Sequence, residues 1–427
     1  MFKHDPIPWQ GGLNWPSDWP LEPPRLRHMP LPPKLIIPAR CTDPKPKPAG
    51  TVVQKGESLL ESPGGPSSPA RGKIIGEKIA SLTNGALAYS VALEIEAADA
   101  EPALAAEQLT VTPSDLPTMD LAGILTRLTQ NGVWAERRCT PDLIAQLNRA
   151  CKRPVDTIIC NCIDHEPPLR PNTVFAAHFG HTIFSAIGLL KKAMNAKTAL
   201  FVLDEAVPAP LLEALQHFAK EAEVQITLLP VRYPQGDPTL LLYSLLARPL
   251  KPGFLPVEHG AMILDAAAAL AVGNSLQFDQ PMVHVPVAVR DRLRNESQYV
   301  LAAVGTPLRD LLDWLEINPD RSAVFTGDLL AQNLAAADTV VAASELKIHT
   351  LPPSADVPSA PCVRCGWCVE QCPMSIHPAR LLEASQQEDK HMAFSAGLDF
   401  CIDCGICSYI CPSQLPLAIS IRKLKAM

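Results

Sequence analysis

The chain has 427 residues, 47% of them hydrophobic, and a formal net charge of −7. This length gives room for two to four domains with buried cores, and the negative charge argues against nucleic-acid binding. The closest candidates for a membrane span, Thr239–Leu246 and Ala266–Val272, are far shorter than the roughly 18 apolar residues required, so we expect no segment that crosses a bilayer.

The first seventy residues contain 16 of the 44 prolines together with Trp9, Trp15 and Trp19. Proline at this density excludes long helices, and disordered linkers are usually poor in tryptophan, so we expect an extended arm packed along the rest of the protein. Short β runs broken by glycine follow at 50–60 and 67–76 and look like the small barrel-sandwich of biotinyl and lipoyl domains. The Met-Lys-Met or Asp-Lys-Ala turn that such carrier domains expose is missing from the sequence. We therefore interpret residues 1–110 as an arm and a scaffold β domain.

Strand and helix patterns alternate between residues 111 and 250, the second predicted domain. The expected strands and helices are, in chain order, Val155–Ile163, Asn172–Met194, Thr198–Leu203, Pro210–Ala222, Val224–Val231 and Thr239–Ala247. This alternation predicts a Rossmann-like parallel sheet covered on both faces, with ligand-binding loops at the carboxyl ends of its strands, at 161–170 and 232–238. Cys160 and Cys162 share one face of the first strand and are interpreted as core thiols.

A smaller α+β unit is predicted for residues 251–340. Its expected strands are Val283–Val289 and Tyr299–Val304, and Pro307–Leu315 is expected to be a helix. A proline-rich linker, Pro352–Pro361, leads into a C-terminal module that we assign to residues 350–427. The predicted fold class is multidomain, α/β and α+β.

Two copies of one cysteine pattern dominate the C-terminal module. Both copies read C-x2-C-x2-C-x3-C-P, the run that holds cubane [4Fe–4S] clusters in two-cluster ferredoxins, where the fourth cysteine of each run ligates the other cluster. We therefore predict a ferredoxin-like helical module with two clusters. One cluster would be held by Cys362, Cys365, Cys368 and Cys411, and the other by Cys401, Cys404, Cys407 and Cys372.

Zinc and disulfides are the alternatives for these cysteines. Zinc sites usually use two C-x2-C pairs rather than a run of four cysteines that ends in proline. Disulfides need an oxidising compartment, and residues 1–10 lack the charged and apolar regions of a signal peptide. The cysteine pattern therefore predicts electron transfer.

The order of these parts resembles the C subunit of Rnf complexes, the membrane-bound ferredoxin:NAD oxidoreductases that move ions. The motifs that carry the resemblance are Gly11-Gly12, the segment Gly50–Ile75, Ile158–Pro167, Arg232-Tyr-Pro-Gln-Gly236, Val304–Leu312 and the double cysteine run. The sheet domain also resembles the flavoprotein subunit of respiratory complex I and the corrin reductases of propanediol use. The resemblance implies a domain for FMN and NAD(H), a β-grasp domain of the SLBB type and a two-cluster module.

The chain departs from the family where the flavin and the nicotinamide would bind. The family carries a glycine-rich loop, G-x-G-G-A-G-F-P-T, whose bare backbone amides approach phosphate closely. The corresponding segment Asn131–Pro141 keeps one glycine and contains Trp134 and Glu136. Gly236-Asp237-Pro238 replaces the family's glycine–glutamate, and Arg170-Pro-Asn-Thr replaces an acidic pair. We therefore predict that the flavin and NADH sites are defective and assign no catalytic residue.

The sequence thus predicts an electron-relay subunit of an Rnf-like, ion-translocating oxidoreductase complex. The resemblance implies a peripheral position on the cytoplasmic face of the bacterial inner membrane. It also implies contact with the other subunits, a ferredoxin-type subunit among them, and with a soluble redox protein. The open alternatives are a complete FMN-dependent NADH dehydrogenase subunit, a soluble enzyme like the corrin reductases, and a docking adaptor without redox function.

Overall fold

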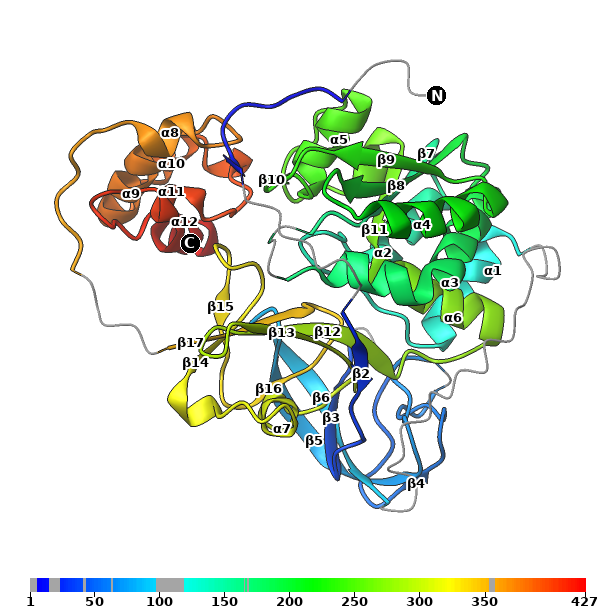
Figure 1. Cartoon of the computed structure of the whole chain (residues 1–427). Helices are drawn as coiled ribbons and strands as arrows, with labels where there is room; N and C mark the ends of the chain where they lie inside the picture. The colour runs from blue at the N-terminus through cyan, green and yellow to red at the C-terminus, as the bar shows by residue number, and fades with distance from the viewer. Residues whose placement is uncertain are drawn as a thin grey trace.

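The computed structural model describes residues 6–14, 24–40, 44–62, 64–96, 119–164, 166, 169–352 and 358–427. The described chain forms a parallel α/β domain, a pair of β-sheets and a small helical module (Figure 1). The helical module stands beside the other two bodies, and the N-terminal arm runs between it and the α/β domain.

A four-stranded parallel sheet in the order β11-β7-β8-β9 forms the centre of the α/β domain. Ile158 and Cys160 of one strand pack in the core with α3 and α6, whereas Ile159 packs with α5 on the opposite face, so both faces are covered. The strands are β7 (Thr157–Asn161), β8 (Thr198–Asp204), β9 (Gln225–Leu229) and β11 (Ala261–Asp265). The helices are α1 (Leu121–Gln130), α2 (Leu143–Ala150), α3 (Pro171–Ala193), α4 (Ala209–Glu221), α5 (Pro238–Leu246) and α6 (Ala266–Phe278).

The predicted succession of strands and helices from β7 to α5 is confirmed, with ends that shift by no more than two residues. The predicted boundary at residue 250 is wrong, because β11 pairs with β7 in parallel register and α6 packs against α3. The segment between α5 and β11 crosses to the opposite edge of the sheet. The α/β domain therefore continues to Phe278.

Two further sheets lie below the α/β domain in Figure 1. A five-stranded sheet contains β3 (Lys34–Pro38), β4 (Val52–Val53), β5 (Gly72–Leu82), β6 (Leu87–Ile95) and β16 (Thr339–Val340). A six-stranded sheet contains β2 (Leu26–His28), β12 (His284–Asp291), β13 (Glu296–Ala303), β14 (Ala323–Thr326), β15 (Asn333–Leu334) and β17 (Lys347–Leu351). The connections in these sheets include α7 (Leu308–Trp314) and the 3-10 turn η3 (Pro319–Arg321), whereas the 3-10 turn η2 (Pro256–His259) precedes β11 in the α/β domain.

The arm is extended where the structure describes it, and it joins the bodies together. Strand β1 (Leu13–Asn14) pairs with β10 (Arg232–Tyr233) of the α/β domain, while β2 and β3 enter the two β-sheets. Trp9 is buried against Tyr233, and its Nε1 donates to Gln235 Oε1 at 2.7 Å. The other two arm tryptophans, Trp15 and Trp19, lie outside the described residues.

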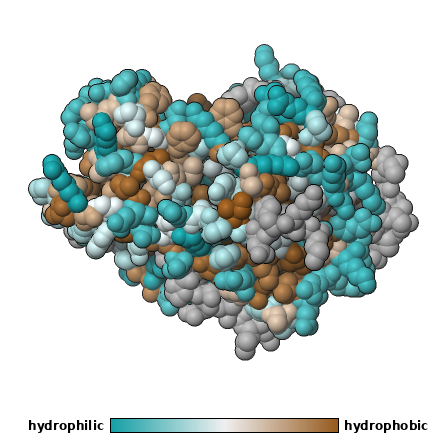
Figure 2. Space-filling view, turned by 90° about the horizontal axis from the view of Figure 1, so that it is seen from above, coloured by the Kyte–Doolittle hydropathy of each residue, from teal (hydrophilic) through white to brown (hydrophobic). Residues whose placement is uncertain are grey.

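The C-terminal module repeats one arrangement twice: a cysteine run, a short helix and a longer helix. Its helices are α8 (Trp367–Glu370), α9 (Pro378–Gln387), α10 (Lys390–Ser395), the 3-10 turn η4 (Leu398–Phe400), α11 (Ile406–Tyr409) and α12 (Leu417–Ala426). Leu381 of α9 and Ile421 of α12 are buried in its small core. From above, the module is a distinct lobe on which hydrophobic and hydrophilic side chains are mixed (Figure 2).

Helix α3 is long and apolar enough to cross a membrane by length and composition. However, 67% of its most apolar window is buried within the protein, where α3 packs on the parallel sheet. It is the core helix of the α/β domain.

Candidate functional site

One group of four cysteines combines residues from both runs. Cys372, the last cysteine of the first run, lines a small apolar cavity with Cys401, Cys404 and Cys407 of the second run. Burial raises the pKa of Cys404 to about 12, and the nearby cysteines Cys401 and Cys372 contribute to the same rise. The structure therefore groups one thiol of the first run with three thiols of the second run.

The second group is the mirror of the first. Burial raises the pKa of Cys368, and the neighbouring cysteines Cys365, Cys411 and Cys362 add to this effect. Cys411 is the last cysteine of the second run, but it lies with the cysteines of the first run. Cys362 and Cys365 are exposed, so this group lies nearer the surface than the group around Cys404.

The two runs also share their backbone conformation. Arg364 and Asp403 lie between the first two cysteines of each run and have φ of 56° and 54°. Gly366 and Gly405 follow with φ of 83° and 78°. A positive φ is uncommon for a residue that is not glycine, and its repetition at matched positions indicates that both cysteine runs require the same turn.

Backbone amides point at the thiols. Met374, Ser375 and Ile376 donate their N–H groups to Cys372, and these bonds oppose the rise in its pKa that burial causes. Such hydrogen bonds stabilise a thiolate and are one of the ways in which a protein sets the potential of an iron–sulfur cluster. Among the described residues, no three His, Cys, Asp or Glu side chains converge closely enough to hold a single metal ion.

A second set of polar residues lies at the carboxyl ends of the parallel strands, where α/β proteins bind ligands. Asp265 is the last residue of β11, and it accepts two hydrogen bonds from Arg137, from Nε to Oδ2 at 2.7 Å and from Nη2 to Oδ1 at 2.5 Å. Asp204 at the end of β8 pairs with Arg170 at 3.2 Å. Asn161 at the end of β7 donates to the carbonyl of Gly236 at 2.7 Å. All three strand ends are thus occupied by partners from within the chain.

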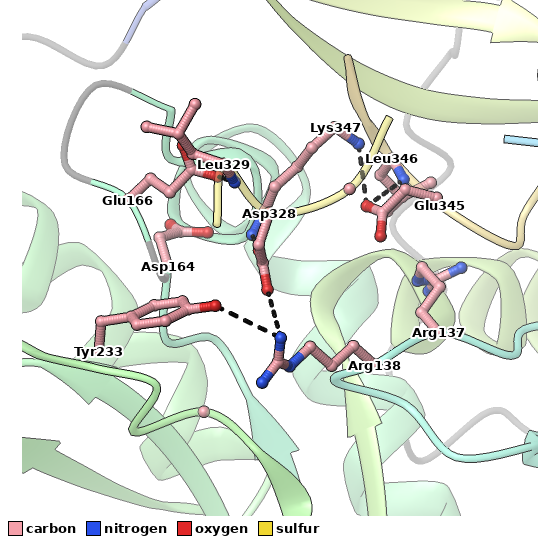
Figure 3. A network of polar contacts seen from close by, with 12 residues as sticks. Arg137, Arg138, Asp164, Glu166, Tyr233, Asp328, Leu329, Glu345, Leu346 and Lys347 are labelled. Carbon is pink, nitrogen blue, oxygen red and sulfur yellow. Dashed lines mark hydrogen bonds and ion pairs between the residues drawn. The ribbon is translucent and has the colours of Figure 1, made fainter. Parts of the chain in front are cut away.

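Arg138 lies at the centre of the same edge (Figure 3). Its Nε is 3.6 Å from Asp237 Oδ2, and its Nη1 is 3.6 Å from Asp328 Oδ2. Burial alone would lower the pKa of Arg138, but Tyr233 and the two carboxylates raise it well above its usual value. Asp328 also pairs with Lys347, which is buried as well. Arg138 therefore remains charged and joins the α/β domain to the six-stranded sheet.

Glu166 and His349 extend this network. The Oε1 of Glu166 accepts a hydrogen bond from the backbone N–H of Leu329 at 2.8 Å and lies 3.4 Å from Nε2 of His349. These contacts attach the loop after β14 to the loop after β7. Glu166, from the predicted ligand loop 161–170, therefore joins the α/β domain to the six-stranded sheet.

The glycine-poor segment Asn131–Pro141 has a different role from the one a glycine-rich loop would have. Gly132 has φ of 62°, and a Cβ at this position would clash with the carbonyl oxygen of Gly65. This glycine is therefore needed for close packing against the N-terminal β region. Val133 and Ala135 are buried, and Arg137 and Arg138 supply the ion pairs described above.

A cavity of about 940 Å³ lies beside these arginines, between the α/β domain, the β-sheets and the module. Its lining includes five cationic side chains but seven carboxyl groups, namely Glu136, Asp142, Asp237, Asp328, Glu345, Asp399 and Asp403. An anion such as a flavin phosphate would meet this acidic lining, and the arginines nearest to it are already paired. These residues do not fit a flavin phosphate.

The arginine network could not be found by sequence reasoning. In the sequence, Arg137 and Arg138 stand out only as part of a segment that lacks the expected glycines. Their partners Asp265 and Asp328 lie more than a hundred residues further along the chain. The cysteine pattern, by contrast, can be read directly from the sequence.

Comparison with known proteins places both parts of the chain. Residues 143–274 match the family described as the Nuo51 FMN-binding domain, and residues 361–415 match a 4Fe-4S dicluster domain. A structure of the NAD+-reducing [NiFe]-hydrogenase in the air-oxidized state matches with a TM-score of 0.52 and 16% identity. The match covers 75% of this chain and 64% of the hydrogenase chain, and it shows a shared fold.

Two relatives belong to ion-translocating complexes. The C subunit of the ion-translocating oxidoreductase complex of Pasteurella multocida is 24% identical over 73% of this chain, which spans only 38% of that protein. The C subunit of the proton-translocating ferredoxin:NAD(+) oxidoreductase complex of Clostridium ljungdahlii is 22% identical over 84% of this chain and 80% of its own length. The predicted similarity to the Rnf C subunit is confirmed.

Proposed function

We propose that this relative of the C subunits of ion-translocating oxidoreductase complexes relays electrons through two [4Fe–4S] clusters and has no flavin of its own. The observation that carries the proposal is the crossed grouping of the cysteines. Cys372 lies with the second run, and Cys411 lies near Cys368 of the first. This exchange is the arrangement that two-cluster ferredoxins use.

The chain supplies the environment that an electron relay needs. When bound, each cubane accepts and releases one electron at a time. Apolar side chains, Ile376 and Ile406 among them, exclude water from the group around Cys404, and backbone amides stabilise its thiolates. The more exposed group, with Cys362 and Cys365, would exchange electrons with a partner at the surface.

The partner would be another subunit of an Rnf-like complex, and a ferredoxin-type subunit is the best candidate. The module exposes several large hydrophobic side chains, which suit such a contact: Val363, Trp367, Phe394, Phe400, Tyr409 and Ile419. We place the chain peripherally on the cytoplasmic face of the bacterial inner membrane. It should sediment with membranes when it is expressed with the genes beside it, and recovery in the soluble fraction together with the neighbouring subunits would contradict this placement.

The proposal also assigns roles to the two β-sheets. The sheet around β5 and β6 would be a barrel-sandwich-like scaffold, and the sheet around β12 and β13 a β-grasp of the SLBB type. Both would hold the module against the α/β domain. Leu330 lies in the loop between β14 and β15 of the six-stranded sheet, and its carbonyl lies against Gly405 of the module. This contact supports the role of that sheet.

Metal analysis of anaerobically purified protein tests the relay. It should contain about eight iron and eight sulfide per chain, and dithionite should bleach its visible absorbance. Stoichiometric zinc with little iron would refute the relay. Iron that dithionite cannot reduce would favour a docking adaptor without redox function.

The match to an FMN-binding domain favours a second candidate, a complete FMN-dependent NADH dehydrogenase subunit. The paired arginines and the acidic lining at the strand ends speak against it. Flavin content distinguishes the two functions.

A further inference from the structure

Three consecutive carbonyls of the second cysteine run accept hydrogen bonds from the α/β domain. Arg138 donates from Nη2 to the carbonyl of Ile402 at 3.1 Å and from Nη1 to that of Asp403 at 3.4 Å. The hydroxyl of Tyr233 donates to the carbonyl of Cys404 at 2.6 Å. Ile402, Asp403 and Cys404 follow directly after Cys401. Arg138 and Tyr233 therefore contact the backbone of a segment that carries two predicted cluster ligands.

Arg138 brings a permanent positive charge to this stretch, because a guanidinium stays protonated in proteins. Its side chain is 18% exposed, and Tyr233 beside it is buried. Little water or salt can therefore screen its charge. Asp237 and Asp328 lie 3.6 Å from the guanidinium and offset part of its charge, whereas its two Nη atoms donate directly to the cysteine run.

We propose that Arg138, through its positive charge, raises the reduction potential of the cluster held by Cys372, Cys401, Cys404 and Cys407. The inference rests on the proposed function, since it requires that these cysteines hold a cluster. An electron taken from the donor adds one negative charge to the thiolate-bound cluster, and no bond forms or breaks. A fixed cation beside the cysteine run stabilises that added charge and makes reduction more favourable.

This inference gives a role to the residues that replace the family's glycine-rich loop. The segment Asn131–Pro141 places Arg138 against the cysteine run, so this edge of the sheet acts on the cluster through a side chain of the protein. Asp237, whose Oδ2 lies 3.6 Å from Nε of Arg138, opposes the effect with its negative charge. The two residues should therefore shift the potential in opposite directions.

A redox titration followed by electron paramagnetic resonance tests the proposal on the full-length protein, with dithionite as reductant. Arg138→Met should move the potential of this cluster to a more negative value. Arg138→Lys keeps the charge and should stay close to the unchanged protein. Asp237→Asn keeps an oxygen that can cap α5 but removes a negative charge, so it should move the potential to a more positive value.

The other cluster serves as a reference within the same molecule, and its potential should stay constant in all three variants. Two unchanged potentials in an Arg138→Met protein with full iron would overturn the proposal and leave the relay intact. A shift in Arg138→Lys as large as that in Arg138→Met would assign the effect to geometry and also overturn it. If Arg138→Met fails to hold iron, Asp237→Asn decides, and an unchanged potential there counts against the proposal. A wild-type protein without clusters would remove both the inference and the proposed function.

Discussion

Cys372 has the first run as its neighbours in sequence and the second run as its neighbours in space. Replacing it with serine should therefore damage the cluster of Cys401, Cys404 and Cys407 and spare the other, because a hydroxyl is a poor ligand for iron in place of a thiolate. Electron paramagnetic resonance and iron content measure the result, and the exposed Cys151→Ser is a suitable control. Loss of only the other cluster would show that each run ligates its own.

Asp164 gives a pH dependence to the stability of the fold. Burial raises the pKa of its carboxyl to about 6, although Asn172 and Thr173 donate hydrogen bonds to it. Because the folded pKa lies above the unfolded value of roughly 3.9, the folded state holds the proton more tightly. The associated stability is present at low pH and is lost as the pH rises through the folded pKa.

The variant Asp164→Asn should remove this dependence. Between pH 5 and 7 the unchanged protein should lose about 1 kcal/mol more free energy of unfolding than the variant does. Denaturant unfolding at several pH values in that range measures the difference. Asp156→Asn is the control: the pKa of Asp156 is lowered despite its partial burial, so its titration lies below this range. Equal slopes for Asp164→Asn and the unchanged protein would contradict the assignment.

The turns of the two cysteine runs are matched elements in different surroundings. Gly366 and Gly405 both have positive φ, so alanine at either position should cost about 1 kcal/mol of backbone strain. A Cβ on Gly366 would meet no described atom within 4 Å, whereas a Cβ on Gly405 would clash with the carbonyl oxygen of Leu330. Gly405→Ala should therefore also push the module away from the six-stranded sheet.

Limited proteolysis and iron content compare the two glycine variants. Gly366→Ala should retain its iron and a protease resistance close to that of the unchanged protein. Gly405→Ala should be cleaved faster in the linker before the module and should lose iron from the group around Cys404. Equal behaviour of the two variants would show that the contact with Leu330 does not hold the module in place.

Elements with a strong local pattern could be predicted from the sequence, and elements defined by distant partners could not. The strands and helices from β7 to α5 carry their own periodicity, and the cysteine spacing encodes the turns of the module. The contact of β11 with β7 depends on where a crossover ends, and the pairing of Arg138 with Asp328 depends on the packing of two bodies. Neither leaves a trace in the local sequence.

At the scale of the whole molecule, the arm, the six-stranded sheet and the α/β domain all hold the module. The arm contributes Gly12, whose N–H donates to the carbonyl of Gln371 at 2.9 Å, just before Cys372. The sheet contributes the loop of Leu330, and the α/β domain contributes Arg138 and Tyr233. Each contact falls beside a predicted cluster ligand. Domain packing and cluster environment are therefore one structural feature, and a change in one should be visible in the other.

The prediction that this protein binds no flavin depends on how all parts of the molecule pack together. A flavin phosphate needs several backbone amides, each worth roughly 0.5–1.5 kcal/mol and more toward a charge, and their joint loss should weaken binding by orders of magnitude. Purified protein should release no stoichiometric FMN on denaturation, and NADH should leave the clusters oxidised while dithionite reduces them. Chromatography of the released flavin and visible absorbance measure both results. One FMN per chain together with rapid bleaching by NADH would restore the role of an NADH-oxidising subunit, and it would mean that Arg137 and Arg138 move aside for the cofactor.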